Sequence, residues 1–399
     1  MSHNLTVTLR SSVLTLLLAF TSSVQAASDD IEREFDVAAN GTLSIESGAG
    51  SIEVRTWEQN RVRVLVRNPR GFEVEIIQRG NDVSIVADSR GRFFGIGRSS
   101  IGFTVDVPIQ YNVSLDTGGG KITVEDISGE VEVDTSGGGI DIGIVTGGDV
   151  KADTSGGSIV IRGATGDVDA DTSGGNITIG DVVGQVIADT SGGRIKIGDV
   201  QGDIEADTSG GSIEVGESTG RVHLDTSGGS IRAGWAMGSI EADTSGGNIH
   251  LAGSDTRVKA DTSGGNIEID AANGPVIADT SGGNITVRNA TASVHADTSG
   301  GRIEVDITTT TGSVNGNIDL DTAGGDIILR VPSNFQASIH ATLDVSRRSR
   351  GDYRIYTDFP LTIQEDNGDI IGRGDINGGG DSVSLETNNS DIYIESVSY

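Results

Sequence analysis

The chain contains no cysteine in its 399 residues. This absence excludes disulfide frameworks, cysteine-ligated zinc or iron–sulfur sites, and cysteine nucleophiles. Basic residues are also scarce, because 28 Lys and Arg stand against 58 Asp and Glu, for a formal net charge of −30 at pH 7. Since nucleic-acid binding depends on neutralising phosphates with Lys and Arg, the composition argues against a nucleic-acid-binding protein.

Aromatic residues make up only 4% of the chain, and high charge with few aromatics is typical of disordered proteins. However, the 35% hydrophobic fraction together with the 60 glycines reaches the apolar share of an ordinary globular protein. Beyond residue 26 the sequence has no apolar run long enough to cross a bilayer as a helix, so it predicts no transmembrane helix.

Residues 1–26 have the features of a secretory signal peptide. Arg10 precedes an apolar run, Val13–Phe20, that is too short to span a bilayer, and the small-residue site Val24-Gln25-Ala26 follows. We expect cleavage before Ala27, with an uncleaved anchor as the alternative. The mature protein is therefore expected to be soluble and either periplasmic or secreted.

A five-residue string, Asp-Thr-Ser-Gly-Gly, occurs ten times in the middle of the chain. Successive copies keep an 18-residue period, apart from one slightly longer interval between Asp134 and Asp153, and a variant of the string follows the last copy at Asp321. The aspartates of the ten copies are Asp134, Asp153, Asp171, Asp189, Asp207, Asp225, Asp243, Asp261, Asp279 and Asp297. A fixed short period is typical of a solenoid, in which each repeat forms one coil and stacks on the next.

Each 18-residue unit predicts two short strands. In residues 189–206, the segments Ile195-Lys196-Ile197 and Ile204-Glu205-Ala206 alternate apolar and polar residues, as strands with one buried face do. Glycine-rich segments separate the strands and predict turns that need positive φ. Three strands per coil are disfavoured, because the apolar residues Ile177 and Val183 are followed at the same interval by Asp189.

We therefore predict an all-β fold, a right-handed parallel β-solenoid with two strands per 18-residue coil, since parallel crossover connections are right-handed by strong preference. Between residues 116 and 331 the only aromatic residue is Trp235. We expect it in a turn, either as a partly exposed contact or packed against Met237. The aromatic-rich ends predict irregular β caps, an antiparallel or mixed one over residues 27–115 and one over residues 332–399 that loosely continues the solenoid.

The repeated aspartates would stack at one spacing along the rod. Neighbouring charges about 4.8 Å apart repel by roughly 1 kcal/mol in water. We expect Asx-turns to offset this repulsion, with each carboxylate accepting backbone N–H groups of the following Ser and Gly. The ten aspartates are thus predicted to form a structural turn ladder. A row of calcium ions is the alternative, but the calcium-binding nonapeptide coil places its glycines before the Asp, the reverse of the order here.

No catalytic, cofactor-binding or metal-binding residue is predicted. One outward-facing column should contain, on successive coils, Lys196, Glu214, Arg232, His250 and Glu268. Its mixed charges are typical of a solvated face stabilised by cross-strand pairs. The histidines His223, His250 and His295 are too scattered to predict a ligand cluster. Coil length is nearly constant, so few loops could shape a cleft, apart from extra residues around 308–312.

One basic and aromatic segment stands out in this acidic chain, within residues 89–98. Its residues Arg90, Arg92, Phe93, Phe94 and Arg98 form a candidate contact loop for a partner or a membrane surface. The alternative is a cap loop that tucks one phenylalanine ring onto the core. Membrane contact is expected through this loop only.

The repeated Asp-Thr-Ser-Gly-Gly-x-Ile-x-Ile units resemble the DUF4097-type family of bacterial adhesin-like β-strand repeat proteins. The segments 105–108, 356–360, 374–380 and 390–394 share in this resemblance, which covers nearly all of the chain after the signal peptide. It implies a surface or envelope location and an adhesion-like role, and supplies no catalytic residue.

We accordingly expect a non-enzymatic extracytoplasmic scaffold or adhesin-like binding protein of the bacterial cell envelope. Its partner would be an envelope or extracellular polymer or protein. The alternatives are a carbohydrate-active enzyme on a β-helix and a calcium-stabilised structural rod.

Overall fold

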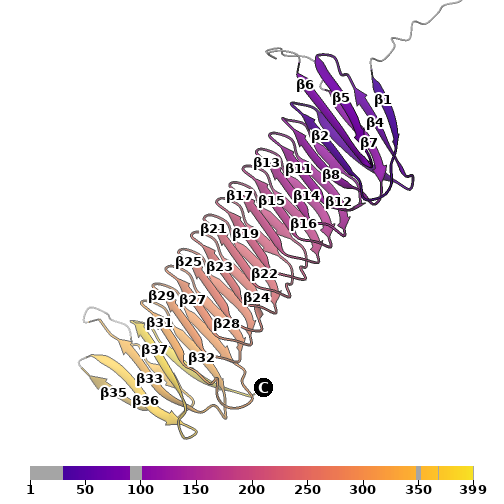
Figure 1. The fold of residues 1–399 in the computed structure, drawn as a ribbon. Coiled ribbons are helices and arrows are strands. Elements are labelled where there is room, and N and C mark those ends of the chain that lie inside the picture. The colour runs from indigo at the N-terminus through magenta and orange to yellow at the C-terminus, as the bar shows by residue number, and fades with distance from the viewer. Residues whose placement is uncertain (1–29, 90–100, 347–351, 367, 399) are drawn as a thin grey trace, which may run out of the picture.

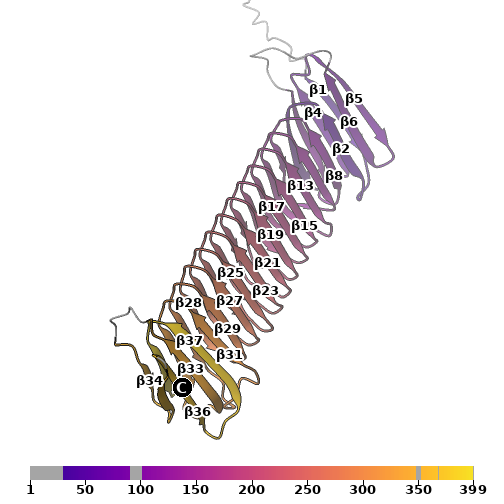
Figure 2. The same ribbon diagram turned by 90° about the vertical axis from the view of Figure 1, so that its left-hand side faces the viewer.

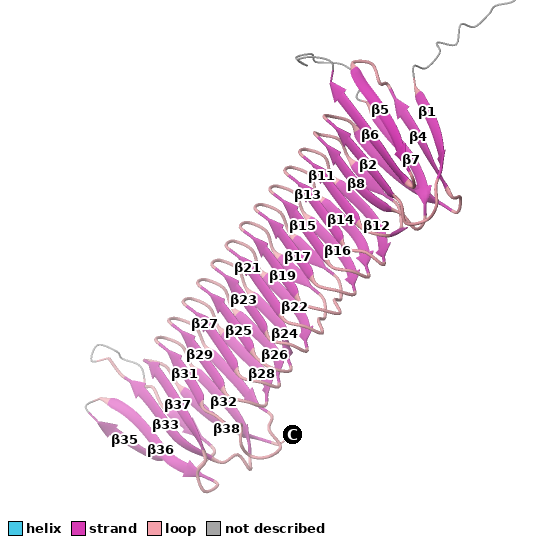
Figure 3. Cartoon of the chain, viewed as in Figure 1, coloured by secondary structure: helices cyan, strands magenta, loops and turns pink. Residues whose placement is uncertain are grey.

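The chain forms a long rod of stacked coils (Figure 1). The computed structural model describes residues 30–89, 101–346, 352–366 and 368–398. These residues form strands joined by turns and loops (Figure 3). None of the described segments is a helix, so none could cross a membrane in helical form.

Two sheets run the length of the rod, and every central coil contributes one strand to each. Sheet A contains, in order along the rod, β1 (Ile31–Asp36), β4 (Arg61–Arg67), β7 (Gly102–Pro108), β3 (Ser51–Trp57), β9 (Ile122–Val124) with β10 (Ile127–Ser128), β12 (Ile140–Thr146), β14 (Ile159–Ala164), β16 (Ile177–Val182), β18 (Ile195–Ile197), β20 (Ile213–Val215), β22 (Ile231–Ala236), β24 (Ile249–Ser254), β26 (Ile267–Ala272), β28 (Ile285–Ala290), β30 (Ile303–Ile307), β32 (Ile327–Pro332), β38 (Ile392–Val397) and β34 (Ile355–Thr357).

Sheet B lies opposite and contains β5 (Phe72–Arg79), β6 (Asp82–Ser89), β2 (Thr42–Ser47), β8 (Asn112–Thr117), β11 (Val131–Thr135), β13 (Val150–Thr154), β15 (Val168–Thr172), β17 (Val186–Thr190), β19 (Ile204–Thr208), β21 (Val222–Thr226), β23 (Ile240–Thr244), β25 (Val258–Thr262), β27 (Val276–Thr280), β29 (Val294–Thr298), β31 (Ile318–Thr322), β37 (Asp381–Asn388), β33 (Ala337–Asp344), β36 (Asp369–Ile376) and β35 (Thr362–Asp366). The predicted all-β solenoid with two strands per coil is confirmed.

The central strands pair in parallel, each with the equivalent strand of the next coil, so identical positions of successive coils lie side by side. On β18 the apolar residues Ile195 and Ile197 are buried, and on β19 so are Ile204 and Ala206. Period-two alternation therefore places one side of each strand in a continuous core between the sheets. Each coil covers the core of its neighbours, because a single coil buries too little apolar surface to fold alone.

Threonine holds the turn after each sheet-B strand. The Thr190 hydroxyl donates to the carbonyl oxygen of Gly175 on the preceding coil at 3.0 Å and accepts the N–H of Gly193 at 3.3 Å. Both hydrogen-bonding roles of this buried hydroxyl are thus satisfied. The same donation to the preceding coil recurs at Thr117, Thr135, Thr154, Thr172, Thr208, Thr226, Thr244, Thr262, Thr280, Thr298, Thr322 and Thr387.

The glycines of the repeated string act through close packing, so the expectation of positive φ at these turns is wrong. Among the described residues, the positive-φ glycines include none from the Asp-Thr-Ser-Gly-Gly strings. A Cβ on Gly193 would instead clash with the backbone carbonyl of Gly175 on the preceding coil. A Cβ on the adjacent Gly192 would have its nearest neighbour at 3.8 Å, an ordinary contact. Only the second glycine of the string is therefore required by space.

At both ends the coils do not stack in chain order. The coil of β2 and β3 lies between the β6/β7 and β8/β9 coils. Likewise the coil of β37 and β38 is inserted between β31/β32 and β33/β34 (Figure 2). The predicted loose continuation near the C-terminus is thus a fully paired coil. Antiparallel pairs then end the sheets at β1/β4, β4/β7 and β5/β6 and at β33/β36 and β35/β36.

Candidate functional site

The ten repeated aspartates stack in register along sheet B, immediately before the buried threonines. The expected Asx-turns are not formed: in the described part of the chain, none of these ten carboxylates accepts a backbone N–H. The threonine hydroxyl accepts the glycine N–H instead. Burial, followed by the charges of Asp207 and Asp171, raises the pKa of Asp189 to about 6. Burial likewise raises the pKa of Asp153 and Asp243.

Carboxylates do bind backbone N–H groups, but in other turns and between coils. Asp149 Oδ1 accepts the N–H of Asp167 at 2.9 Å, and Asp167 Oδ1 accepts the N–H of Gln185 at 2.8 Å. Each acceptor lies one coil before its donor, so these side chains stitch neighbouring coils together. The signal in the sequence is the recurrence of Asp, Asn or Ser at the first position before a strand.

The predicted outward column on sheet A is present, with Lys196, Glu214, Arg232, His250 and Glu268 on consecutive strands. Lys196 Nζ lies 3.0 Å from Glu214 Oε1, and Arg232 Nη1 lies 2.6 Å from His250 Nδ1. The column is therefore a cross-strand network of paired polar groups, as the sequence indicated.

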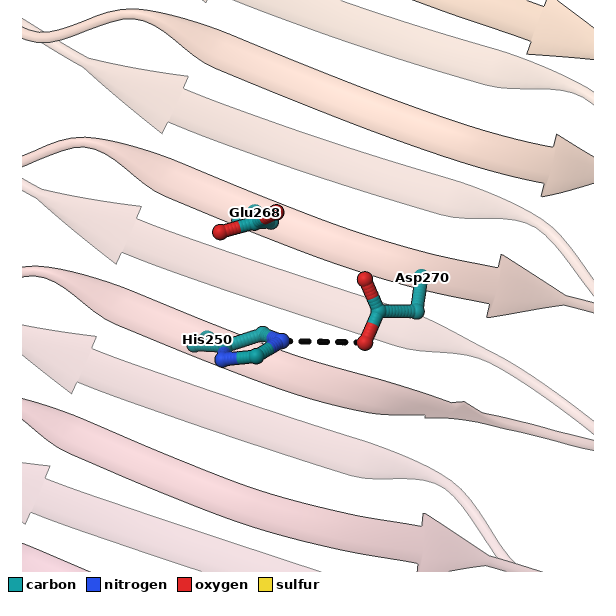
Figure 4. Close-up of side chains that lie close together, drawn as sticks. All are labelled: His250, Glu268 and Asp270. Atoms are coloured by element: carbon teal, nitrogen blue, oxygen red, sulfur yellow. Dashed lines mark hydrogen bonds and ion pairs between the residues drawn. The ribbon is translucent and has the colours of Figure 1, made fainter.

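The structure adds a cluster of His250, Glu268 and Asp270 to this column (Figure 4). His250 Nε2 lies 2.9 Å from Asp270 Oδ2, and one ligand atom from each residue lies within 4.8 Å of the others. A nitrogen and two carboxylates could hold a divalent metal. However, Arg288 Nη1 already pairs with Glu268 at 2.5 Å and with Asp270 at 3.2 Å. The cluster is thus an ion-pair network in which Arg288 supplies the positive charge that a bound metal ion would otherwise bring.

Sequence reasoning missed Asp270 as a partner of His250. The equivalent positions of earlier coils hold Gly216 and Gly234, which have no side chain. The sequence therefore indicated no polar column at this position. The signal was the two-residue step from Glu268 to Asp270, which places both carboxylates on the same face of β26.

A groove runs along the edge of sheet A, and we call it the sheet-A groove. Its volume is about 550 Å³. It is lined by Ile144, Arg162, Gly163, Ala164, Thr165, Asp181, Val182, Val183, Asp199, Val200, Gln201, Glu217, Ser218, Thr219, Trp235 and Met237. The near-constant coil length predicts few loops that could shape a cleft. The groove needs none, because it forms within the coils themselves.

Glycines shape this groove. The strands β18 and β20 end at Ile197 and Val215, and Gly198 and Gly216 follow directly. A Cβ on Gly198 would lie 2.5 Å from Asp181 Oδ1, a distance too short for a Cβ atom and a non-bonded oxygen. The two outward columns beyond this bend form the groove walls, and buried residues such as Val200 form its floor.

The groove ends are apolar and exposed. At one end Ile144 is 48% exposed, and at the other Met237 is 58% exposed. Val183 is 47% exposed and lies farther along, on the same coil as Asp181. Trp235 is half-buried on β22, so the expectation of a turn position is wrong. Its indole lies against Gly253 on the next coil, where a Cβ would come within 2.7 Å of Trp235 Cζ3. Apolar side chains gathered on one face indicate a contact surface.

The middle of the groove is acidic. Asp181, Asp199 and Glu217 occupy one column on three consecutive coils, beside the bridged residues of the floor. Asp181 Oδ1 accepts the N–H of Asp199 at 3.1 Å, and Asp199 Oδ1 accepts the N–H of Glu217 at 2.9 Å. These bonds fix both aspartates at the interval of the coils.

Two other predictions have different outcomes. The candidate contact loop with Arg90, Arg92, Phe93, Phe94 and Arg98 lies outside the described residues, as does the predicted signal peptide. The extra residues around 308–312 are described, and their hydrogen bonds lead to the C-terminal coil. Thr309 donates to the carbonyl oxygen of Ser313 at 2.8 Å, and Ser313 Oγ lies 2.8 Å from Asp381 Oδ2. The extra loop thus anchors the inserted C-terminal coil.

Comparisons with known proteins find distant solved structures. No family model matches the chain, and no curated protein matches it. A solved candidate cell adhesion protein from Clostridium sporogenes is 7% identical with a TM-score of 0.19, covering 92% of this chain and all of its own. A candidate adhesin from Parabacteroides distasonis is 14% identical with a TM-score of 0.30, covering 70% and 98%. A candidate lipid-binding protein from the same organism is 14% identical with a TM-score of 0.24, covering 67% and 98%. Values this low give no information about what this chain binds.

Proposed function

We propose that the protein is a non-enzymatic binding rod of the bacterial cell envelope, which presents its surface to an envelope or extracellular polymer. The observation that carries this proposal is the sheet-A groove. It is long and open, combines exposed apolar ends with an acidic middle, and crosses six consecutive coils, from that of Ile144 to that of Trp235. A surface of this form suits a linear partner better than a small enclosed substrate.

The rest of the rod supports the same use. Threonine hydroxyls and turn aspartates bond each coil to the preceding one, and parallel strands pair along both sheets. Such stacking keeps side chains at a constant interval over many coils. A polymer with a regular repeat can then make the same contact several times, and several weak contacts add up to useful affinity.

The location is part of the proposal. The features of residues 1–26 support export from the cytoplasm. The excess of acidic residues supports solubility and repulsion from anionic surfaces.

A carbohydrate-active enzyme is the competing function, and one observation favours it. Asp189 has a pKa raised to about 6 and stacks between other carboxylates. A glycosidase uses such a carboxyl group, with a raised pKa and a second carboxylate nearby, as its general acid. Against it, the same arrangement repeats along the ladder, with burial also raising the pKa of Asp207 and Asp279. A repeated geometry is what a structural column produces, and it singles out no pair for chemistry.

One experiment tests both functions. The purified mature rod is sedimented with insoluble polysaccharides of known composition, both neutral and amino-sugar polymers, and new reducing ends are measured in the same tubes. Binding to at least one polymer without new reducing ends supports the binding rod. Depolymerisation that is lost in Asp189→Asn would overturn it in favour of the enzyme, and sedimentation with none of the polymers would also overturn it.

A further inference from the structure

We propose that the sheet-A groove binds an amino-sugar polymer with free, positively charged amino groups. This inference rests on the proposed binding function and names the chemistry of the partner. It is carried by three features of the groove: its direction, the interval of its charges and the position of its aromatic side chain.

The groove follows the long axis of the rod. Its walls contain residues from successive coils, beginning with Ile144 on β12 and ending with Trp235 and Met237 on and after β22. Five steps between coils span on the order of 25 Å. A ligand that fills it must therefore be elongated, with about six repeating units if each unit matches one of the six coils.

The charges call for a polycation with one charge per coil. Asp181, Asp199 and Glu217 repeat at the coil interval, about 4.8 Å. The opposite wall offers uncharged groups, Gln201 and Thr219 among them. Amines along a glucosamine chain recur once per sugar ring, a length close to one coil. Where successive rings are turned over, the amines on one side recur at every second ring, and so at the interval from Asp181 to Glu217.

The one basic side chain of the lining leaves this acidic middle intact. Arg162 Nη2 lies 3.4 Å from Asp141 Oδ1, a carboxylate outside the groove lining that it shares with Lys121, so Arg162 pairs away from the wall carboxylates. Arg162 also comes from the coil of β14, before the first of the three wall carboxylates.

The aromatic side chain fits a sugar. Trp235 is half-buried and held against Gly253, which leaves its position fixed before a ligand arrives. Its indole offers an apolar face for the C–H groups of a pyranose ring and attracts a nearby ammonium group. Met237 adds an adaptable apolar contact at the same end.

A basic peptide fits less well. Side chains on one face of an extended peptide are about 6.6–6.8 Å apart, which does not match the coil interval. Peptides also gain affinity by pairing their backbone with an exposed strand edge. The central strands at the groove are paired on both sides, as β16 is with β14 and β18, so the groove offers no such edge.

The test uses a fully deacetylated glucosamine hexamer as the probe, with calorimetric titration into the full mature protein. The N-acetylated hexamer of equal length removes the charge, and hexalysine supplies the same charge on a peptide. The groove variant is Asp181→Asn/Asp199→Asn/Glu217→Gln, which keeps the side-chain oxygens that accept the N–H groups of Asp199 and Glu217. The matched control is Glu132→Gln/Asp169→Asn/Glu205→Gln, with the same charge change on exposed positions of sheet B.

We expect the deacetylated hexamer to bind, and the groove variant to bind at least about tenfold more weakly, with the control variant within about twofold of wild type. Trp235→Leu, which removes the aromatic ring but keeps an apolar side chain, should also weaken binding of the hexamer while leaving the melting curve nearly unchanged. The N-acetylated hexamer should bind at least about tenfold more weakly than the deacetylated one.

The inference is overturned if the glucosamine hexamer does not bind, or if the two triple variants lose affinity for it equally. It is also overturned if hexalysine binds as tightly as the glucosamine hexamer and its affinity is unchanged by Trp235→Leu. These results would not decide the proposed function. A rod that still sediments with a neutral polysaccharide remains a binding rod, and only the identity of its groove ligand would then be wrong.

Discussion

The Thr190 hydroxyl and the Gly175 carbonyl oxygen are hydrogen-bonded at 3.0 Å across two neighbouring coils. The same hydroxyl accepts the N–H of Gly193, so one buried side chain closes its own turn and ties it to the turn before. Repeated along the rod, this bond makes the turns a continuous ladder parallel to the sheets.

Replacing Thr190 by Val should remove both bonds while keeping the shape of the side chain. The buried carbonyl of Gly175 and the N–H of Gly193 would lose their partner, at a cost of about 1–3 kcal/mol. Thr190→Ser should recover most of the loss. Hydrogen exchange at the neighbouring coils measures the effect locally, as suits a repeat protein. The exposed Thr178→Val serves as the control, and an equal effect of both valine variants would contradict this role.

The two glycines of one string should respond differently to alanine. Gly193→Ala introduces a Cβ that clashes with the backbone of the preceding coil, so it should destabilise the rod by about 1–3 kcal/mol. Gly192→Ala finds room, and restricting the unfolded chain should make it neutral or stabilising by up to about 1 kcal/mol. Thermal unfolding of the two variants side by side provides the measurement. Equal melting temperatures would refute the close-packing argument.

The aspartate ladder should make the rod less stable as pH rises. The pKa of Asp189 is raised to about 6 by burial and then by its neighbours, so the folded state holds this proton more tightly than the unfolded state does. Between the ordinary Asp value of about 4 and pH 6, the folded state therefore binds more protons, and stability falls with rising pH across this window.

Asp189→Asn isolates this effect. It should raise stability at pH 7 by on the order of 1 kcal/mol, after allowance for solvent screening of a partly exposed group, and should have little effect at pH 4. Chemical unfolding at the two pH values gives the comparison. A variant that is less stable than wild type at pH 7 would show that the carboxylate is favourably bound there.

Replacing Arg330 should destabilise the rod more than replacing Arg288, although both side chains pair with carboxylates of neighbouring coils. Arg330 lies 2.5 Å from Glu304, 3.0 Å from Asp306 and 2.9 Å from Glu395, and so links β30, β32 and the inserted β38. These carboxylates hold the pKa of the Arg330 guanidinium above its usual range. Because its side chain is 29% exposed, we expect Arg330→Gln to cost about 1–3 kcal/mol.

Arg288→Gln is the matched comparison, because this side chain is 44% exposed and pairs with carboxylates of one neighbouring strand, β26, whereas Arg330 joins the strands on both sides of it. Exposed pairs contribute about 1 kcal/mol or less. Limited proteolysis near residue 380 should detect release of the C-terminal coil in the Arg330 variant and not in the Arg288 variant. The reverse order would argue that the inserted coil is held by its strands alone.

Much of the fold follows from the repeat itself. An 18-residue period with two alternating segments places Ile195 beside Ile213 and Lys196 beside Glu214, because identical positions of stacked coils must share a register. The outward column on sheet A could be written down from this rule. The local pattern is sufficient here because strand pairing repeats without a change from coil to coil.

Other features depend on which atoms meet once the coils are stacked. The sequence predicted Asp189 as the acceptor in the turn, and the structure assigns this role to Thr190, because the backbone path points the threonine inward. Similarly, Asp270 meets His250 because its side chain reaches toward the preceding coil.

The sequence by itself therefore determined the strands, their register and the columns of like residues, since period and alternation are local properties of the chain. Only the tertiary structure decided the threonine ladder, the inserted terminal coils and the sheet-A groove. These arise from the distance and direction between neighbouring coils, and that spacing is fixed by packing of the whole stack rather than by any one repeat.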